Sequence, residues 1–123
     1  DVQWRLQDVL QWQLSEEKWD LIVSNPPYIP IGEKEQMEDS VIGYEPHIAL
    51  FTPDDDPSIF YKVIHQISQS QLRENGLVAL ETHHLLGPKV AALWNDPHRW
   101  EVTLKSDLQG KERFVFVQRK GNA

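Results

Sequence analysis

The feature that most constrains the fold is a short apolar run that ends at two consecutive prolines. Trp19 to Val23 carries mostly apolar side chains, and Asn25-Pro26-Pro27 follows it almost directly. A run of this length is typical of a strand that is buried on both faces of a parallel sheet. Because proline has no N–H to donate to a neighbouring strand, the strand has to end at the motif. The sequence therefore predicts a buried strand that delivers Asn25 to the carboxyl edge of a sheet.

The remaining periodic segments predict an α/β fold in which strands and helices alternate and the last two strands are adjacent. Only a short turn around Gly110 separates those two strands, so they should be antiparallel. Asn75-Gly76 should end the first helix. The expected strands are Val2–Leu6, Trp19–Val23, Leu77–Leu80, Trp100–Leu104 and Phe114–Val117, and the expected helices begin at Asp56-Pro57 and at Pro88.

Between the proline motif and the first helix, the apolar residues of Ile29 to Asp56 show no sustained helical or strand period. A connection of this length is typical of a lid, a binding loop or a disordered segment. Four tryptophans sit in apolar periods and are expected in the core, whereas Trp12 lies in a polar stretch. The four are Trp4, Trp19, Trp94 and Trp100.

Composition limits the classes of function. The chain has 123 residues, enough for one modest domain, and it lacks cysteine, so disulfides and thiolate metal sites are excluded. It carries neither an apolar run of membrane-spanning length nor a signal-peptide pattern, which is compatible with a cytoplasmic location. The formal net charge is −7 and no dense basic run is present, which disfavours direct binding to nucleic acid.

The motif Asn25-Pro26-Pro27-Tyr28 has a chemistry of its own. Asn25 precedes a proline and is held extended, and the two prolines make a stiff turn. The Asn25 side-chain oxygen and the Pro26 carbonyl could accept both hydrogens of a planar NH₂ group, while the Tyr28 ring packs on its face. Holding both hydrogens exposes the nitrogen lone pair to an electrophile such as a sulfonium methyl group. A simple strand-ending turn remains the alternative.

Three blocks of sequence resemble one family. Asp20–Pro30 (DLIVSNPPYIP), Tyr44–Phe51 (YEPHIALF) and Lys105–Val115 (KSDLQGKERFV) are similar to the release-factor glutamine N5-methyltransferases, the HemK or PrmC family. The blocks occur in the family's order and the resemblance covers essentially the whole chain. It implies S-adenosyl-L-methionine as cofactor and a peptide-chain release factor as the protein substrate.

The resemblance also implies roles for particular residues. Asn25 to Tyr28 match the substrate-amide motif, so Asn25, Pro26 and Tyr28 are the expected catalytic residues, with Pro27 in substrate binding and Asn25 also near the cofactor. Asp8 matches an acidic residue near the adenosine, and Val9 stands where the family often has an aromatic residue against the adenine. Glu45-Pro46 matches a family element to which we assign no role. Thr82-His83-His84 replaces the family's small residue and glycine after Glu81.

The implied fold is the C-terminal half of a Rossmann-like class I methyltransferase sheet, with strand order 3-2-1-4-5-7-6 and only the third strand onward present. Residues 1–123 are then a single partial domain, without the cofactor glycine loop or the N-terminal helical domain. The chain also starts at Asp1 rather than at a methionine. Trp19–Val23 would become an edge strand, so the isolated chain is expected to bind the cofactor weakly or not at all, and its exposed edge makes self-association possible.

Two other classes of function remain open. The same motif occurs in methyltransferases that act on amino groups of nucleic acids, and the isolated chain could instead be a non-catalytic interaction module. A metal site at His83-His84 is disfavoured because adjacent side chains on an extended chain point apart. Asp54-Asp55-Asp56 is explained as an acidic cap on the following helix.

Overall fold

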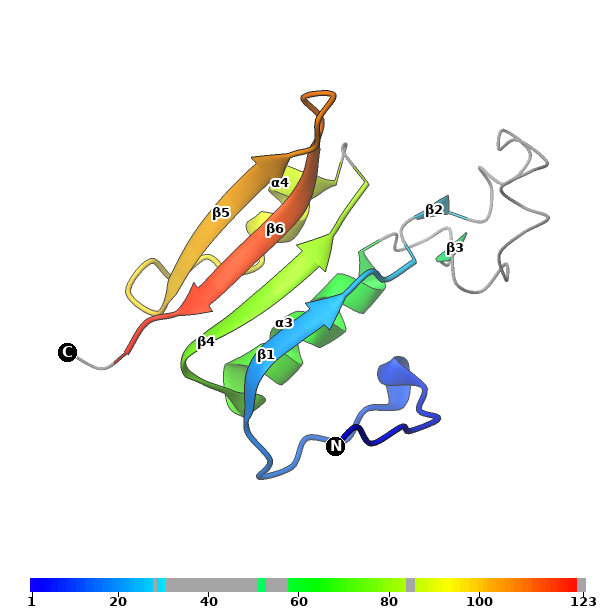
Figure 1. The fold of residues 1–123 in the computed structure, drawn as a ribbon, viewed down its shortest axis with the longest axis vertical. Helices are drawn as coiled ribbons and strands as arrows, with labels where there is room; N and C mark the ends of the chain where they lie inside the picture. The colour runs from blue at the N-terminus through cyan, green and yellow to red at the C-terminus, as the bar shows by residue number, and fades with distance from the viewer. Residues whose placement is uncertain (28, 31–50, 53–57, 84–85, 122–123) are drawn as a thin grey trace.

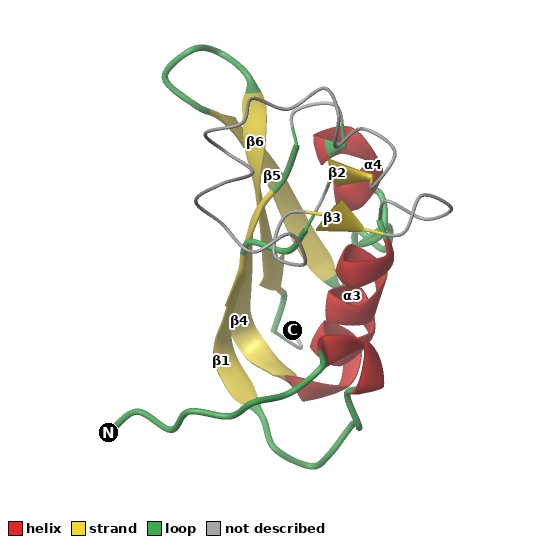
Figure 2. Cartoon of the chain, turned by 90° about the vertical axis from the view of Figure 1, so that its right-hand side faces the viewer, coloured by secondary structure: helices red, strands yellow, loops and turns green. Residues whose placement is uncertain are grey.

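The computed structural model of the chain describes residues 1–27, 29–30, 51–52, 58–83 and 86–121. Within these ranges, four strands form a mixed sheet in the order β1-β4-β6-β5, and helices α3 and α4 lie on the same face of it (Figures 1 and 2). The elements are η1 (Val9–Gln11), β1 (Trp19–Ser24), β2 (Ile29–Pro30), β3 (Phe51–Thr52), α3 (Ile59–Gln71), β4 (Leu72–Glu81), α4 (Gly87–Ala91), β5 (Trp100–Ser106) and β6 (Glu112–Arg119).

The sheet confirms the α/β prediction and its antiparallel ending. β1 pairs parallel to β4, while β6 pairs antiparallel to both β4 and β5. This is the order 4-5-7-6 that the resemblance implied. The turn between β5 and β6 is tight because Gly110 adopts φ +82° and the Asp107 carboxylate accepts hydrogen bonds from the backbone N–H groups of Gln109 and Lys111, at 2.8 and 3.0 Å.

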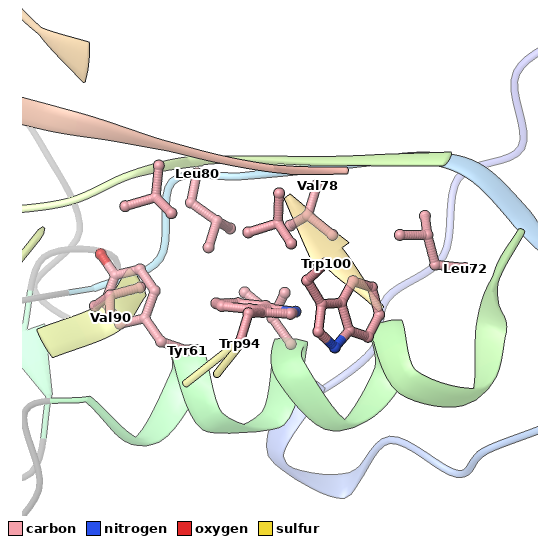
Figure 3. Packing of buried hydrophobic residues seen from close by; sticks show 10 residues of the cluster. Tyr61, Leu72, Val78, Leu80, Val90, Trp94 and Trp100 are labelled. Carbon is pink, nitrogen blue, oxygen red and sulfur yellow. The ribbon is translucent and has the colours of Figure 1, made fainter. Parts of the chain in front are cut away.

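The hydrophobic core fills the space between the sheet and the two helices (Figure 3). Trp94 and Trp100 are 3% and 4% exposed, as predicted for both. The indole Nε1 of Trp94 donates to Ser68 Oγ at 2.9 Å, so its polar atom is satisfied inside the core. Pro88 stands in the first turn of α4, as predicted, and Val90 of that helix is fully buried.

The prediction of a strand at Val2–Leu6 was wrong. Residues 1–8 form no strand, and Val2, Trp4 and Leu6 are 75%, 90% and 107% exposed. An alternating pattern makes a strand only where a neighbouring strand supplies ladder hydrogen bonds and a surface to bury the apolar side chains. No described strand pairs with this segment, so Trp4 is on the surface and not in the core.

The prediction that the Trp19–Val23 strand is buried on both faces was also wrong. Leu21 is 54% exposed and Val23 is 69% exposed, whereas Ile22 and Ser24, which point to the other face, are partly buried. The cause is position: β1 is a terminal strand of the described sheet, and helices α3 and α4 both lie on the opposite face from Leu21 and Val23. The expectation that this strand becomes an edge is confirmed.

Both ends of the first long helix differ from the prediction. Ser58 is the N-cap, two residues after Asp56, which lies with Pro57 outside the described residues. The helix ends at Gln71, before Asn75-Gly76, and β4 starts at once. Asn75 adopts φ +64° inside β4. The pairing jumps there, with Trp19 opposite Leu72 but Leu21 opposite Leu77, so the intervening residues bulge out of the ladder.

Substituting Gly76 with alanine should destabilise this bulge. A Cβ at Gly76 would lie 2.8 Å from the Arg73 carbonyl oxygen and 2.8 Å from Leu72 Cδ1, which is closer than a side chain can approach backbone. We expect a loss of about 1–3 kcal/mol in the free energy of unfolding, measured by urea denaturation. Gly121→Ala is the matched control, because its Cβ would meet only the Asn75 side chain at ordinary distances of 3.5 Å or more. Equal effects at both positions would contradict the clash.

Acid should weaken the packing of α3 against the segment after α4. The His65 ring meets Trp94 edge to face, with centroids 5.1 Å apart. Burial, and to a lesser extent the nearby Arg99 charge, lower the pKa of His65 from 6.5. The unfolded chain therefore binds this proton more readily than the folded chain, so stability is lost as the pH falls below 6.5. Denaturation between pH 7.5 and 5 should show a weaker pH dependence in His65→Gln, whereas exposed His98→Gln serves as control.

Candidate active site

The proline motif lies where the sequence placed it, at the carboxyl end of β1 (Figure 1). Ser24, the last residue of β1, pairs with Leu80 of β4, so the motif is beside the carboxyl end of β4. Asn25 is exposed, Pro26 is buried and Pro27 is partly buried. Tyr28 lies outside the described residues. The burial of Pro26 fixes the turn, while the Asn25 side chain stays free to meet a ligand.

A cavity of about 450 Å³ lies against the motif, along the free edge of β1 and the adjoining face of α3. It brings Val9 together with Pro26 and Pro27, three of the predicted site residues. Its lining residues are Val9, Trp12, Trp19, Leu21, Ile22, Val23, Ser24, Pro26, Pro27, Phe60, Ile64 and Ile67.

Asp8 and Asn25, the other predicted cofactor contacts, are not among the residues that line this cavity. The Asp8 carboxylate accepts a hydrogen bond from the Leu10 backbone N–H at 2.9 Å and caps η1. An N-cap carboxylate satisfies a helix-end donor that otherwise has no partner. Asp8 therefore positions Val9 at the cavity, and its own side chain is exposed.

Gln71 is a site-shaping residue that the sequence analysis did not identify. It is fully buried at the end of α3, and its amide oxygen accepts a hydrogen bond from Trp12 Nε1 at 3.0 Å. Its amide nitrogen donates to Ser15 Oγ and to the Glu17 carbonyl, each at 3.1 Å. These bonds hold the segment before β1 against the helix. The signal was available, because Gln71 continues the buried helical face of Ile64 and Ile67.

The carboxyl end of β4 is fixed by two hydrogen bonds. The Tyr61 hydroxyl donates to the Glu81 carbonyl at 2.8 Å, and the Thr82 N–H donates to the Arg113 carbonyl at 2.7 Å. Thr82 is 1% exposed, so the departure from the family pattern after Glu81 places a buried side chain there. In the part of the chain that the structure describes, no group of three or more His, Asp or Glu side chains could hold a metal ion, and His84 lies outside that part.

An ion pair closes the neighbouring turn. Arg113 Nε lies 2.6 Å from Asp107 Oδ2. Hydrogen bonds lower the pKa of the Asp107 carboxyl. The bond from the Lys111 backbone N–H has the largest effect, followed by the bonds from the Gln109 backbone N–H and from the Arg113 side chain. Asp107 and Arg113 both belong to the third block of the family resemblance. The block therefore has a structural role, which is to hold the β5–β6 turn beside the end of β4.

The residues of this cavity fit only part of S-adenosylmethionine. A flat apolar ring could pack among Val9, Trp12 and the prolines. The ribose hydroxyls and the charged amino-acid end need polar partners. Ser24 supplies the single hydroxyl among the lining residues, and the Trp12 N–H is already bonded to Gln71. The described lining residues therefore offer an apolar wall with few polar partners.

Known proteins match the chain over nearly its whole length. It is 34% identical, over 95% of its residues, to the release factor glutamine methyltransferase of Flavobacterium psychrophilum, and 34% identical, over 96%, to that of Bacteroides thetaiotaomicron. The chain is therefore similar to a part of these methyltransferases. It spans 41% and 43% of the length of these two relatives. No protein-family model matches it.

A solved structure supports the family at the level of the fold. The protein-(glutamine-N5) methyltransferase from Alicyclobacillus acidocaldarius, described as release factor-specific, is 27% identical and superposes with a TM-score of 0.51. The match covers 85% of this chain and 50% of that one. The four-stranded sheet is therefore similar to a part of that methyltransferase's fold. None of the described helices has the length and apolarity that a bilayer span requires.

Proposed function

We propose that the protein to which this chain belongs methylates the side-chain amide nitrogen of a glutamine in a peptide-chain release factor, with S-adenosyl-L-methionine as methyl donor. The observation that carries the proposal is the position of Asn25-Pro26-Pro27 at the carboxyl end of β1, beside an apolar cavity. Ligands of open α/β sheets bind at this edge. Such an enzyme would act in the cytoplasm, where release factors work.

The motif residues would hold the substrate amide and leave its nitrogen reactive. The Asn25 side-chain oxygen and the Pro26 carbonyl accept the two amide hydrogens, and the rigid turn keeps both acceptors in place. The nitrogen lone pair is then withdrawn from the amide and directed outward. Positive charge that develops on the nitrogen is stabilised by the same two acceptors, and the nitrogen afterwards loses a proton to water. Tyr28 would pack on the face of the amide.

The bound cofactor supplies an electrophilic methyl group on a sulfonium. On this chain, Val9 would pack against the adenine, and Asp8 and Asn25 would lie near the adenosine and the methyl group. Because the cavity lacks partners for the ribose and the amino-acid end, we propose that this segment alone binds the cofactor weakly or not at all.

The experiment compares this chain with one extended upstream to the length of its relatives. Each is incubated with S-adenosylmethionine carrying a tritiated methyl group and, in separate reactions, a release factor, duplex DNA or ribosomal RNA. We expect label on a glutamine of the release factor, mapped by mass spectrometry. The label should appear only in the reaction that contains the longer chain. Label on the DNA or the RNA would instead show that the protein methylates amino groups of nucleic-acid bases. The net charge of −7 disfavours that alternative.

A further inference from the structure

A carboxylate that the proposed mechanism does not use lies beside the proline motif. Ser24 of β1 pairs with Leu80 of β4 in a parallel register. One residue further along both strands, at their carboxyl ends, Asn25 comes beside Glu81, the last residue of β4 (Figure 1). Neighbouring strands are about 4.8 Å apart, so side chains at these two positions are within reach of each other when they point to the same face.

The side chains of Asn25 and Glu81 share the face of the sheet that lies away from the helices. Successive side chains of a strand alternate between its two faces. Val23 faces away from the helices and is exposed, and so is Asn25 two residues further on, whose backbone is kept extended by the proline that follows. On β4, Leu80 is buried in the core, which puts the partly buried Glu81 on the other face.

The Glu81 carboxylate is not engaged by the part of the chain that the structure describes. Its backbone carbonyl accepts the hydrogen bond from Tyr61, but no described residue forms a hydrogen bond or an ion pair with its side chain. Lys105 lies in register with Glu81 across β6, with Phe114 between them. The Lys105 ammonium lies instead over the ring of Phe116, 5.7 Å from its centroid. The carboxylate therefore keeps its full capacity to accept hydrogen bonds.

We propose that Glu81 is a positioning residue whose carboxylate accepts a hydrogen bond from the Asn25 side-chain NH₂ group. This inference rests on the proposed methyl transfer, in which the Asn25 oxygen has to face the substrate amide. An asparagine side chain has a donor end and an acceptor end of similar shape, and an exposed one can rotate to present either. A carboxylate only accepts, so it binds the donor end and leaves the oxygen for the substrate.

The side-chain hydrogen bond between Glu81 and Asn25 forms by rotation about side-chain torsions. In the described structure Asn25 is exposed and is not bonded to Glu81. Hydrogen bonds within a catalytic site often tighten only when the substrate is bound. A glutamine amide between Asn25 and Pro26 restricts the Asn25 side chain to one orientation, and Glu81 stabilises that orientation.

The first test is a double-mutant cycle in the chain extended upstream to the length of its relatives, with kcat/KM for methyl transfer to a release factor as the readout. We expect Glu81→Ala to lower kcat/KM by up to about 10²-fold, the loss that a misplaced group produces. Glu81→Gln should retain most of the activity, because its side-chain oxygen still accepts the hydrogen bond. In the Asn25→Ala background, Glu81→Ala should have no further effect, since no side-chain amide is left to orient.

Glu101→Ala is the matched control, because it removes an exposed carboxylate from β5 of the same sheet and should keep the wild-type rate. Losses that multiply in the double variant would overturn the proposal, since Glu81 would then act independently of Asn25. An equal loss in Glu81→Gln and Glu81→Ala would also overturn it, because the carboxylate would then be needed for its charge or to take a proton.

The second test reads the Asn25 side chain without any methyl transfer. In the extended chain labelled with ¹⁵N-asparagine, the Asn25 side-chain NH₂ signal is the one missing from Asn25→Ala. We expect Glu81→Ala, but not Glu101→Ala, to shift this signal, in the free protein or with a glutamine peptide of the release factor added. An unchanged signal under both conditions would overturn the proposal. If the extended chain does not methylate a release factor, the proposed function fails, and this signal still decides whether Glu81 orients Asn25.

Discussion

Replacing Asn25 with alanine is expected to lower the rate of methyl transfer by about 10²–10³-fold, the usual effect of removing one group that stabilises a developing charge. Asn25 is exposed at the end of β1, so its removal leaves no buried polar group without a partner. The free energy of unfolding should therefore be unchanged. The measurement is kcat/KM for a release-factor substrate in the chain extended upstream to the length of its relatives, with thermal unfolding in parallel.

The control for this variant is Asn95→Ala, which removes the same amide from another exposed position, after α4. It should retain the wild-type rate. A rate that is unchanged in Asn25→Ala would remove this side chain from the mechanism and leave the Pro26 carbonyl as the single acceptor of the motif. A lower rate together with a lower melting temperature would point instead to a structural role at the strand end.

Replacing Trp94 with alanine is expected to lower the free energy of unfolding by about 3–5 kcal/mol. Trp94 is 3% exposed and packs in the core beside Trp100 (Figure 3), and its ring also meets the His65 ring edge to face. Its loss leaves a cavity and also leaves Ser68 Oγ, itself buried, without the indole donor. A loss of this size is a large part of the stability of a small domain, so urea denaturation should show a much lower midpoint.

Trp4→Ala is the matched control for Trp94→Ala. The same atoms are removed from a side chain that is 90% exposed, so stability should change by less than about 0.5 kcal/mol. Trp94→Phe separates the contribution of core packing from that of the hydrogen bond, since phenylalanine keeps most of the side-chain volume and loses the hydrogen bond to Ser68. A large effect at Trp4 would mean that the segment before η1 is packed in solution.

The two tryptophans also show what the sequence could and could not predict. Both sit in apolar periods, and both were expected in the core. Trp94 follows a helix whose start is marked locally by Pro88, and its partners in the core are present in the described sheet. Trp4 lies in an alternating stretch whose burial depends on a strand elsewhere, and local pattern carries no information on whether that strand is present. The same reason explains why Leu21 and Val23 are exposed although their strand was predicted correctly.

The site was predictable where chemistry is concentrated in consecutive residues. The position of Asn25-Pro26-Pro27 at a strand end follows from the inability of proline to continue a ladder. Gln71 escaped prediction because its partners, Trp12 and Ser15, are more than fifty residues away in sequence. The bulge at Asn75-Gly76 was read as a helix stop, because a residue with positive φ serves equally well in a turn within a strand.

The strand order β1-β4-β6-β5 also sets an order of assembly. β5 and β6 are joined by a five-residue turn, so this hairpin closes at little entropic expense and can form first. β4 joins it across the longer segment that contains α4. β1 has to close the longest of these connections, and among the described strands it pairs with β4 alone. The strand that ends at the proline motif is therefore expected to be the last of the four described strands to be secured during folding and the first to be released when the sheet opens locally.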